Sequence, residues 1–279
     1  MAESPRAGVA VALRRDLGLG ARFARARARS ELQYRTSFAL LSLAQVAALL
    51  TDLVAILALF SKVPAIGGWR REQVLVLYAV TTTAFALANA VASPVDYLAE
   101  WVRTGRFDRL LLRPAGPLAQ LAGMEFQLRR LAALPPAVVT LVVAGSLGHV
   151  PLTVRSLALL TLAVLGSATL FGALFVATAS LAFWSPDSDE VANAFTYGGQ
   201  LAAQYPAHVY ADWLRRWMFS LVPVGLAAYA PVMAAVGAPN PLGLPAWLEA
   251  TGPLVALPFL FLAALAWRTG TRRYASTGS

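Results

Sequence analysis

LALLTLAVLGSATLFGALFVATASLAFW, Leu157 to Trp184, is the stretch that decides the class of this protein. It holds no ionisable side chain, and about 20 consecutive apolar residues allow a helix to cross the hydrocarbon core of a bilayer. The rest of the chain agrees, because 58% of its 279 residues are hydrophobic and only 13% are charged. This composition argues against a soluble fold, and we predict an all-α polytopic membrane protein.

Five further apolar stretches bring the predicted number of transmembrane helices to six. They are Phe38–Phe60, Val74–Ala92, Leu131–Leu147, Val191–Tyr205 and Trp247–Trp267. The third contains Pro135 and Pro136, so a kink is expected near its start. Val191–Tyr205 is short and polar for a full crossing, and prolines follow it at positions 206, 223 and 231. We therefore expect residues 205–237 to form re-entrant helices, which enter the membrane without crossing it, before the last span.

Polar residues inside the first two spans have two interpretations. The threonines at 81–83 and Asn89 can hydrogen-bond between helices. Asp52 places a charge in mid-membrane, where a carboxylate usually faces protein or water. It is either a residue of a translocation path or a structural residue that hydrogen-bonds the hydroxyls of the second span.

The distribution of positive charge predicts the orientation in the membrane. Six crossings place both termini on one side, together with the Ser93–Arg130 loop, and this side carries 17 of the 23 lysines and arginines. We therefore predict a multi-pass protein of the inner or plasma membrane of the cell, with both termini cytoplasmic. If residues 191–205 stayed inside and Phe219–Val236 crossed instead, the 17 would become 19. The charge count thus leaves the side of residues 205–217 open.

The predicted organisation has three parts. Residues 1–36 form a cytoplasmic basic segment, in which Ala21–Tyr34 is either a helix lying at the lipid headgroups or a solvated tail. Residues 37–268 contain the six spans, a cytoplasmic element at 93–117 and the re-entrant region at 205–237. Residues 269–279 form a cytoplasmic tail.

The cytoplasmic element begins with residues that are typical of a helix start. Ser93 can cap a helix, Pro94 suits its first position, and Asp96 can complement its positive end. Apolar residues then recur at three- and four-residue spacing, which predicts an amphipathic helix with Glu100 and Arg103 paired on its polar face.

Gly105 can end this helix in the left-handed conformation. A second short helix is expected over Phe107–Leu112, with Leu110 and Leu111 turned inward, until Pro114 stops it. Its outward face would carry Arg106, Arg109 and Arg113. The alternative for the whole element is an ordinary loop that orients the protein by its positive charge.

The order of residues in this element resembles a known family. GRFDRLLLRPAGPLAQL, Gly105–Leu121, resembles the first cytoplasmic loop of ATP-binding-cassette (ABC) exporter permeases of the type 2 superfamily, in the branch with a Gly-x-Phe-Asp-x-Leu-Leu-x-Arg-Pro motif. The matching positions are Gly105, Phe107, Asp108, Leu110, Leu111, Arg113 and Pro114. Tyr205–Pro231 looks like the re-entrant segment before the last span in that superfamily, although Ala211 stands where many relatives carry proline.

The resemblance implies a permease subunit that dimerises and is driven by a separate ATPase. The partners implied are an ABC ATPase, a second permease, identical or paralogous, and membrane lipids. The resemblance assigns coupling to the ATPase to Asp96, Glu100, Arg103, Gly105, Arg106, Phe107, Asp108, Arg109, Arg113 and Pro114. Phe107 is expected to be an apolar anchor in a groove of the ATPase, and the arginines to meet acidic groups or lipid phosphates.

ATP and Mg are expected in the partner subunit rather than in this chain. A P-loop needs a Gly-Lys-Ser/Thr sequence to cradle phosphate, and the sole lysine, Lys62, is followed by Val63. His149 and His208 are isolated from carboxylates, so neither a metal site nor acid–base catalysis is predicted. We therefore expect no catalytic residue and no bound cofactor.

Other classes of function fit the residues less well. A net charge of +9 could suggest nucleic acid, but the arginines flank apolar spans and do not cover a soluble face. An intramembrane enzyme would need convergent polar groups, which the sequence does not offer. An ion-coupled secondary transporter acting without an ATPase stays as the alternative, because broken helices and a buried carboxylate also suit it. The transported substrate is left open.

Overall fold

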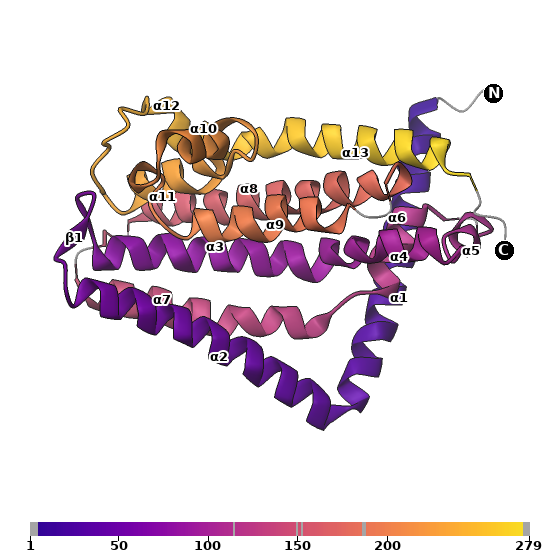
Figure 1. The fold of residues 1–279 in the computed structure, drawn as a ribbon, viewed down its shortest axis with the longest axis horizontal. Coiled ribbons are helices and arrows are strands. Elements are labelled where there is room, and N and C mark those ends of the chain that lie inside the picture. The colour runs from indigo at the N-terminus through magenta and orange to yellow at the C-terminus, as the bar shows by residue number, and fades with distance from the viewer. Residues whose placement is uncertain (1–4, 114, 149, 152, 186–187, 276–279) are drawn as a thin grey trace.

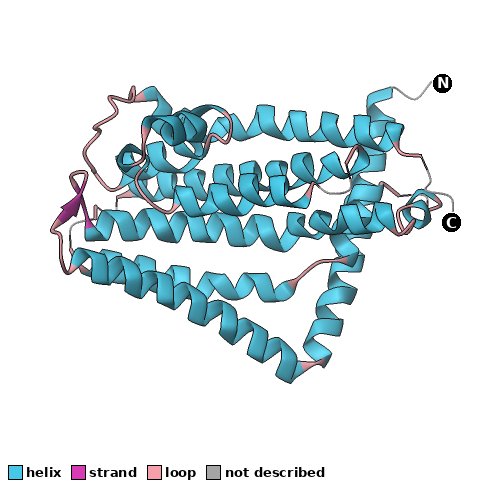
Figure 2. Cartoon of the chain, viewed as in Figure 1, coloured by secondary structure: helices cyan, strands magenta, loops and turns pink. Residues whose placement is uncertain are grey.

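The computed structural model describes residues 5–113, 115–148, 150–151, 153–185 and 188–275. These residues are almost entirely helical (Figure 2), and their two strands, β1 (Ala65–Ile66) and β2 (Trp69–Arg70), pair antiparallel. The α-helices are α1 (Pro5–Gln33), α2 (Arg35–Phe60), α3 (Arg71–Ala92), α4 (Leu98–Arg103), α5 (Asp108–Leu111), α6 (Pro117–Met124), α7 (Leu134–Ser146), α8 (Val154–Ala179), α9 (Asp189–Ala203), α10 (Asp212–Ser220), α11 (Ala230–Ala235), α12 (Trp247–Thr251) and α13 (Ala256–Arg273). Short 3-10 helices and one π-helix lie between some of them: η1 (Ser93–Tyr97), η2 (Leu128–Ala133), η3 (Ser180–Phe183), η4 (Ala207–Val209), η5 (Gly225–Tyr229, the π-helix) and η6 (Gly252–Val255).

The long helices form a bundle with two different ends. Figure 1 shows α2, α3, α7, α8, α9 and α13 running roughly along the longest axis of the molecule. At one end α1 lies across the bundle and packs against α6, close to α4 and α5. At the other end lie the β1–β2 hairpin and the short helices α10, α11 and α12. The start of α1 and the last turn of α13 both lie at the first end (Figure 1).

Five of the predicted spans are present as helices that are long and apolar enough to cross a membrane. They are Arg35–Phe60, Arg71–Ala92, Leu128–Ser146, Val154–Phe183 and Trp247–Arg273. Where a kink was expected at Pro135 and Pro136, the 3-10 helix η2 changes into the α-helix α7. The two prolines occupy the first turn of α7. Proline is tolerated there because the first amide groups of a helix have no partner within it.

The region between α8 and α13 departs from a simple sixth span. The predicted fifth stretch forms α9, whose 15 residues extend about 22 Å at 1.5 Å per residue, short of a hydrocarbon core of about 30 Å. α9 nevertheless packs against α8 and α3 inside the bundle. After it, Asp212–Ser220 and Gly225–Ala235 meet at an angle of 80°. Both arms lie at the hairpin end (Figure 1), and the re-entrant interpretation stays a prediction.

Burial separates a central helix from a peripheral one. Inside the chain, 83% of the apolar window of α3 is buried, against 22% of that of α2. The hydroxyl groups of Thr81 and Thr83 on α3 donate to the carbonyls of Leu77 and Ala79 in the same helix, at 2.8 and 2.7 Å. The expectation that these two threonines bond between helices is therefore wrong, because the carbonyl four residues back is the nearer acceptor.

Candidate functional site

The predicted helix, glycine, helix element is present at the end of the bundle that carries α1. α4 ends at Arg103, Gly105 follows with φ of +67°, and α5 begins at Asp108. A positive φ suits glycine because it has no Cβ, so Gly105 ends the helix as expected. Pro114, the predicted stop, lies outside the described residues.

The predicted capping role of Ser93 is wrong, although a new helical segment, η1, does begin at Ser93, with a proline in its first positions and Asp96 in its first turn. The chain runs from α3 through η1 into α4 without a break, and Ser93 itself has helical φ and ψ of −62° and −22°. Its hydroxyl donates to the carbonyl of Asn89 at 2.6 Å, so it does not accept a bond as a cap would. Membrane helix α3 and the element are therefore joined by helical turns without an intervening loop.

The apolar face of the element is buried against the ends of the membrane helices. It forms a cluster, here called the Phe107 cluster, with residues of α6, α8, η3 and α13. Its buried members are Val95, Leu98, Ala99, Val102, Phe107, Leu110, Leu121, Ala179, Ala182 and Trp267.

The ring of Phe107 is completely buried in this cluster. It meets the rings of Tyr274, Phe183 and Trp267 edge to face, with centroids 5.0, 5.2 and 6.3 Å away. The expectation that Phe107 is an anchor in a groove of a partner is therefore wrong, because the chain's own helices already fill its surroundings. The motif residue ties the element to α13 and η3.

The outward face of the element is charged, with two exposed leucines at its tip. Arg103, Arg106, Arg109 and Arg113 are exposed. Leu110 is buried as predicted, whereas Leu111 is 47% exposed, which corrects its inward placement, and Leu112 is 86% exposed. The four-residue length of α5 explains the difference, since one helical turn can present only one leucine to the cluster.

Two arginines of the face have partners within the chain. The predicted partner of Glu100 was Arg103, but Arg106 occupies that place, with its Nη1 atom 3.4 Å from Oε1 of Glu100. The turn at Gly105 brings Arg106 back over α4. Arg113 lies over the ring of Phe23 on α1, 5.9 Å from the centroid, and its Nη1 atom is 3.9 Å from the sulfur of Met124.

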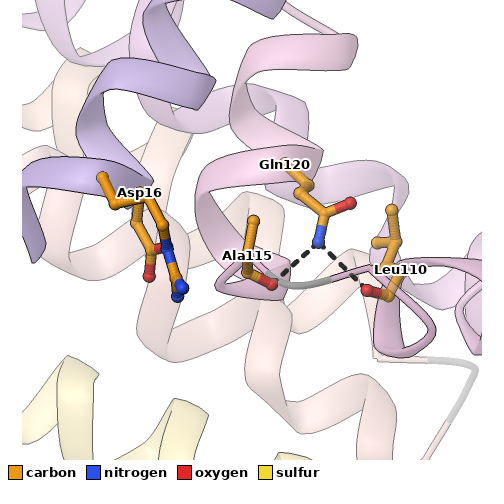
Figure 3. A network of polar contacts seen from close by, with 5 residues as sticks. Asp16, Leu110, Ala115 and Gln120 are labelled. Atoms are coloured by element: carbon orange, nitrogen blue, oxygen red, sulfur yellow. Dashed lines mark hydrogen bonds and ion pairs between the residues drawn. The ribbon is translucent and has the colours of Figure 1, made fainter. Parts of the chain in front are cut away.

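A buried amide holds the turn that follows α5. The side chain of Gln120 on α6 is 1% exposed, and its Nε2 atom donates to the carbonyls of Leu110 at 3.0 Å and Ala115 at 2.8 Å (Figure 3). Asp16 of α1 lies beside the same turn. The C-terminal end of the element is therefore fixed from two sides, by α6 and by α1.

The hydroxyl of Tyr274 lies close to Asp108, the motif aspartate. Burial, followed by the adjacent carboxylate of Asp108, raises the pKa of Tyr274 to about 12. The phenol is therefore neutral at physiological pH and can act as a donor to Asp108. This contact links the second helix of the element to the residue after α13.

A polar cavity of about 370 Å³ separates the element from the start of α9. Asp96, Glu100 and Arg103 line it from the element, and Arg130 and Tyr197 face them from η2 and α9. Three of the predicted coupling residues are thus brought together around one space. Gly105, Arg106, Phe107, Asp108, Arg109 and Arg113 do not line it.

A second polar cavity, of about 260 Å³, continues into the membrane-spanning part. It is lined by Gln45, Ala48, Leu49, Asp52, Thr82, Phe85, Ala86, Asn89, Arg130, Ala133, Tyr197, Gln200, Leu201 and Gln204. Arg130 and Tyr197 border both cavities. Asp52 therefore faces a polar space that adjoins the one at the element.

Sequence reasoning missed most of the residues around Asp52. Tyr197, Gln200 and Gln204 recur at three- and four-residue spacing, which marks a polar face of a helix in a stretch noted only as short and polar. That periodicity could have identified them. Arg130 could not be found in this way, because its place depends on how η2 turns. Within the described residues, no three His, Cys, Asp or Glu side chains form a group that could hold a metal ion. His208 belongs to this part of the chain, and His149 lies outside it.

Comparison with known proteins gives one match. A family model described as ABC-2 family transporter protein matches residues 46–278. The matched region contains the element, the helices that line both cavities except for the first part of α2, and the hairpin end. No curated protein and no solved structure gives a match.

Proposed function

The chain belongs to the ABC-2 family of transporter proteins, and on that premise we propose that it is the permease of an ATP-driven exporter whose ATP is hydrolysed by a separate subunit. The family makes it a multi-pass transport component of the membrane and implies an ATP-binding partner. A second copy or a paralogue completes the translocation path. The branch with the Gly-x-Phe-Asp motif is the part of the family to which we assign it.

The observation that carries the proposal is how the element is attached to the membrane helices. Its Phe107 face is buried against α13 and η3, its first helix continues from α3, and its outward face is charged. Packed interiors transmit displacement because they are as dense as crystals of small molecules. A partner that pushes on the outward face therefore moves three membrane segments together.

The outward face supports a partner with an acidic and partly apolar groove. Arg103, Arg106 and Arg109 supply positive charge around the exposed side chain of Leu112. Burial of a leucine side chain contributes about 1.5–3 kcal/mol, so Leu112 takes the role of apolar anchor that the sequence assigned to Phe107. For coupling, the contact must differ in strength between the two nucleotide states of the ATPase.

The two polar cavities support a path that begins beside the element. They adjoin at Arg130 and Tyr197 and lead from Glu100 to Asp52. In the proposed exporter, a movement of α4 changes the first cavity directly, because α4 forms one of its walls. Asp52 then lies further along the path, where a carboxylate can hold a polar or cationic part of the cargo.

Co-expression with an ABC ATPase subunit tests the proposal. We expect the two proteins to copurify, and we expect export to stop when the catalytic glutamate of the ATPase is replaced by glutamine, with the complex still assembled. Leu112→Ala should weaken the association, and Val154→Ala is the matched control, because Val154 is 88% exposed at the start of α8. Ion-driven export by this chain without the ATPase would establish the secondary-transporter alternative instead.

A further inference from the structure

A third cavity, of about 440 Å³, lies on the side of α2 that faces η2. Leu41, Ala44, Gln45 and Ala48 form its wall on α2, and the opposite wall is made by Arg129 and Arg130. We call it the α2 groove. Two positive charges and no carboxylate line it, so its electrostatics favour an anion.

A buried amide positions the two arginines of the groove. Nη2 of Arg129 and Nε of Arg130 donate to Oε1 of Gln127, at 2.9 and 3.0 Å. Gln127 is 3% exposed, whereas both arginines are partly exposed. A neutral amide fixes the orientation of the guanidinium groups without neutralising them, and Arg130 also borders the cavities of Glu100 and Asp52.

The groove extends in both directions along one face of α2. Towards α1 it meets a cavity of about 250 Å³, which shares Leu41 and Arg129 and contains both Arg27 and the carboxylate of Glu31. Glu31 accepts a bond from the backbone amide of Arg129 at 3.3 Å. In the other direction the groove shares Gln45, Ala48 and Arg130 with the cavity of Asp52. Its cationic part thus lies between two regions that already contain acidic groups.

The position of the groove corresponds to the surface of a bilayer. Arg129 and Arg130 stand in the first turn of the span Leu128–Ser146, and α1 lies across the bundle at the same end (Figure 1). Arginines at this depth reach lipid phosphates. The α2 wall then continues towards the hydrocarbon through Leu41, Ala44 and Ala48, with Gln45 beside them, and adjoins the cavity of Asp52 at Ala48.

We propose that the α2 groove binds one anionic membrane phospholipid, with its phosphate between Arg129 and Arg130 and an acyl chain along Leu41, Ala44 and Ala48. The lipid enters sideways from the leaflet that surrounds α1. Charge complementarity favours it over a second copy of the chain, whose own corresponding face would be equally positive. The adjoining face of α2, with Leu40, Leu43 and Val54 about 62–63% exposed, is the one available to a protein.

Photo-crosslinking in nanodiscs tests this site without any ATPase. The full chain is placed in phosphatidylcholine nanodiscs that contain a trace of photoactivatable phosphatidylglycerol, or of the same probe with a choline headgroup. We expect the glycerol probe to label α2 around residues 41–48 about tenfold more than the choline probe, because both headgroups carry the phosphate but the choline group adds a positive charge that the two arginines repel. Equal labelling by both probes would overturn the proposal.

Matched variants separate the groove from general attraction to the membrane. Arg129→Gln with Arg130→Gln should reduce this labelling about tenfold, whereas Arg22→Gln with Arg25→Gln on the exposed side of α1 should leave it unchanged. Ala48→Phe should block the groove, whereas Ala47→Phe, one residue away on the helix, should not. If Arg22→Gln with Arg25→Gln reduced the labelling as much as Arg129→Gln with Arg130→Gln, or Ala47→Phe as much as Ala48→Phe, a defined site would be refuted.

The absence of cysteine from the sequence permits a direct test of the competing occupant. Ala48→Cys creates a single thiol in the groove. If the groove faces lipid, oxidation leaves this variant monomeric on a non-reducing gel. A disulfide-linked dimer at Ala48→Cys would show that a second copy covers the groove, and the proposal would be wrong.

Discussion

Two aromatic clusters hold irregular segments of the chain at opposite ends of the bundle, and they do so by different means. At the end with α1, Phe107 meets three rings edge to face, and its own contacts are all apolar. Burial of this kind has no preferred direction beyond the fit of the surfaces. The cluster can therefore keep most of its stabilisation when its parts tilt slightly.

At the hairpin end, the corresponding cluster around Trp69 adds hydrogen bonds to stacking. The rings of Trp69 and Tyr229 lie 5.2 Å apart at an angle of 13°. Nδ1 of His208 is 3.0 Å from the hydroxyl of Tyr229, and Nε1 of Trp69 donates to the carbonyl of Pro239 at 3.2 Å. Hydrogen bonds weaken steeply when they bend, so this cluster fixes one arrangement of the hairpin, η4 and η5.

The contrast indicates which end of the permease can move with a partner. The Phe107 cluster is apolar packing beneath an exposed charged face, with the bonds of Gln120 confined to the turn after α5, whereas the rings of the Trp69 cluster themselves make hydrogen bonds. In the proposed exporter, the first end would follow the ATPase and the second would hold the hairpin end of the path in place. Four substitutions or conditions can break or sharpen this contrast.

The largest effect is expected from Phe107→Ala. Removal of a fully buried phenylalanine ring costs about 3–5 kcal/mol, because the rings of Phe183, Trp267 and Tyr274 lose a common partner. Thermal unfolding of the purified permease in detergent measures this loss. Leu112→Ala, at an 86% exposed position, is the control and should leave the midpoint nearly unchanged. Similar midpoints for Phe107→Ala and wild type would mean that the cluster does not hold the element.

A smaller loss of stability is expected from Gly270→Ala, which overpacks the same cluster. A Cβ atom at Gly270 on α13 would lie 2.3 Å from Cδ2 of Phe183, a distance at which the ring must move. Overpacking of this kind costs about 1–3 kcal/mol. Gly18→Ala on α1 is the control, because a Cβ there meets nothing within 4 Å and alanine favours the helix. If both variants unfold at the wild-type midpoint, the cluster is looser than the contrast requires.

The element and the cavities show what the sequence could and could not predict. The five long spans and the left-handed glycine at Gly105 follow from local chemistry, and the sequence predicted them correctly. The inward direction of Phe107 could not be predicted, because it depends on α13, which lies about 150 residues later in the chain. The same applies to Ser93, whose hydroxyl can cap a helix or bond the preceding turn. Local sequence left that choice open, and continuity with α3 decided it.

At the hairpin end, Tyr229→Phe tests the hydrogen bonds of the contrast. The ring and its stacking on Trp69 remain, and only the hydroxyl that faces His208 is removed. A typical buried hydrogen bond contributes about 0.5–1.5 kcal/mol, so a correspondingly small decrease of the unfolding midpoint is expected. Tyr34→Phe, at a position 70% exposed, is the control. A midpoint for Tyr229→Phe as high as that of wild type would remove the distinction between the clusters.

The smallest expected effect is a dependence of stability on pH that only the Trp69 end shows. Burial lowers the pKa of His208 below its usual 6.5, the charge of Arg215 lowers it further, and the backbone of Gly67 and Ile66 opposes the shift. The folded protein therefore favours the neutral imidazole, and between the two pKa values the unfolded chain binds more protons. Stability should be constant above about pH 6.5 and should fall as the pH drops towards the folded-state pKa.

Unfolding midpoints measured from pH 7.5 down to pH 5.5 separate this effect from the packing at the other end. In His208→Asn the decrease below the usual pKa should disappear, because asparagine does not titrate. In Phe107→Ala the whole curve should shift to lower temperature while its slope stays that of wild type, since the rings around Phe107 carry no group that titrates in this range. A changed slope in Phe107→Ala would mean that the two ends are coupled, and the division into one mobile and one fixed end would have to be abandoned.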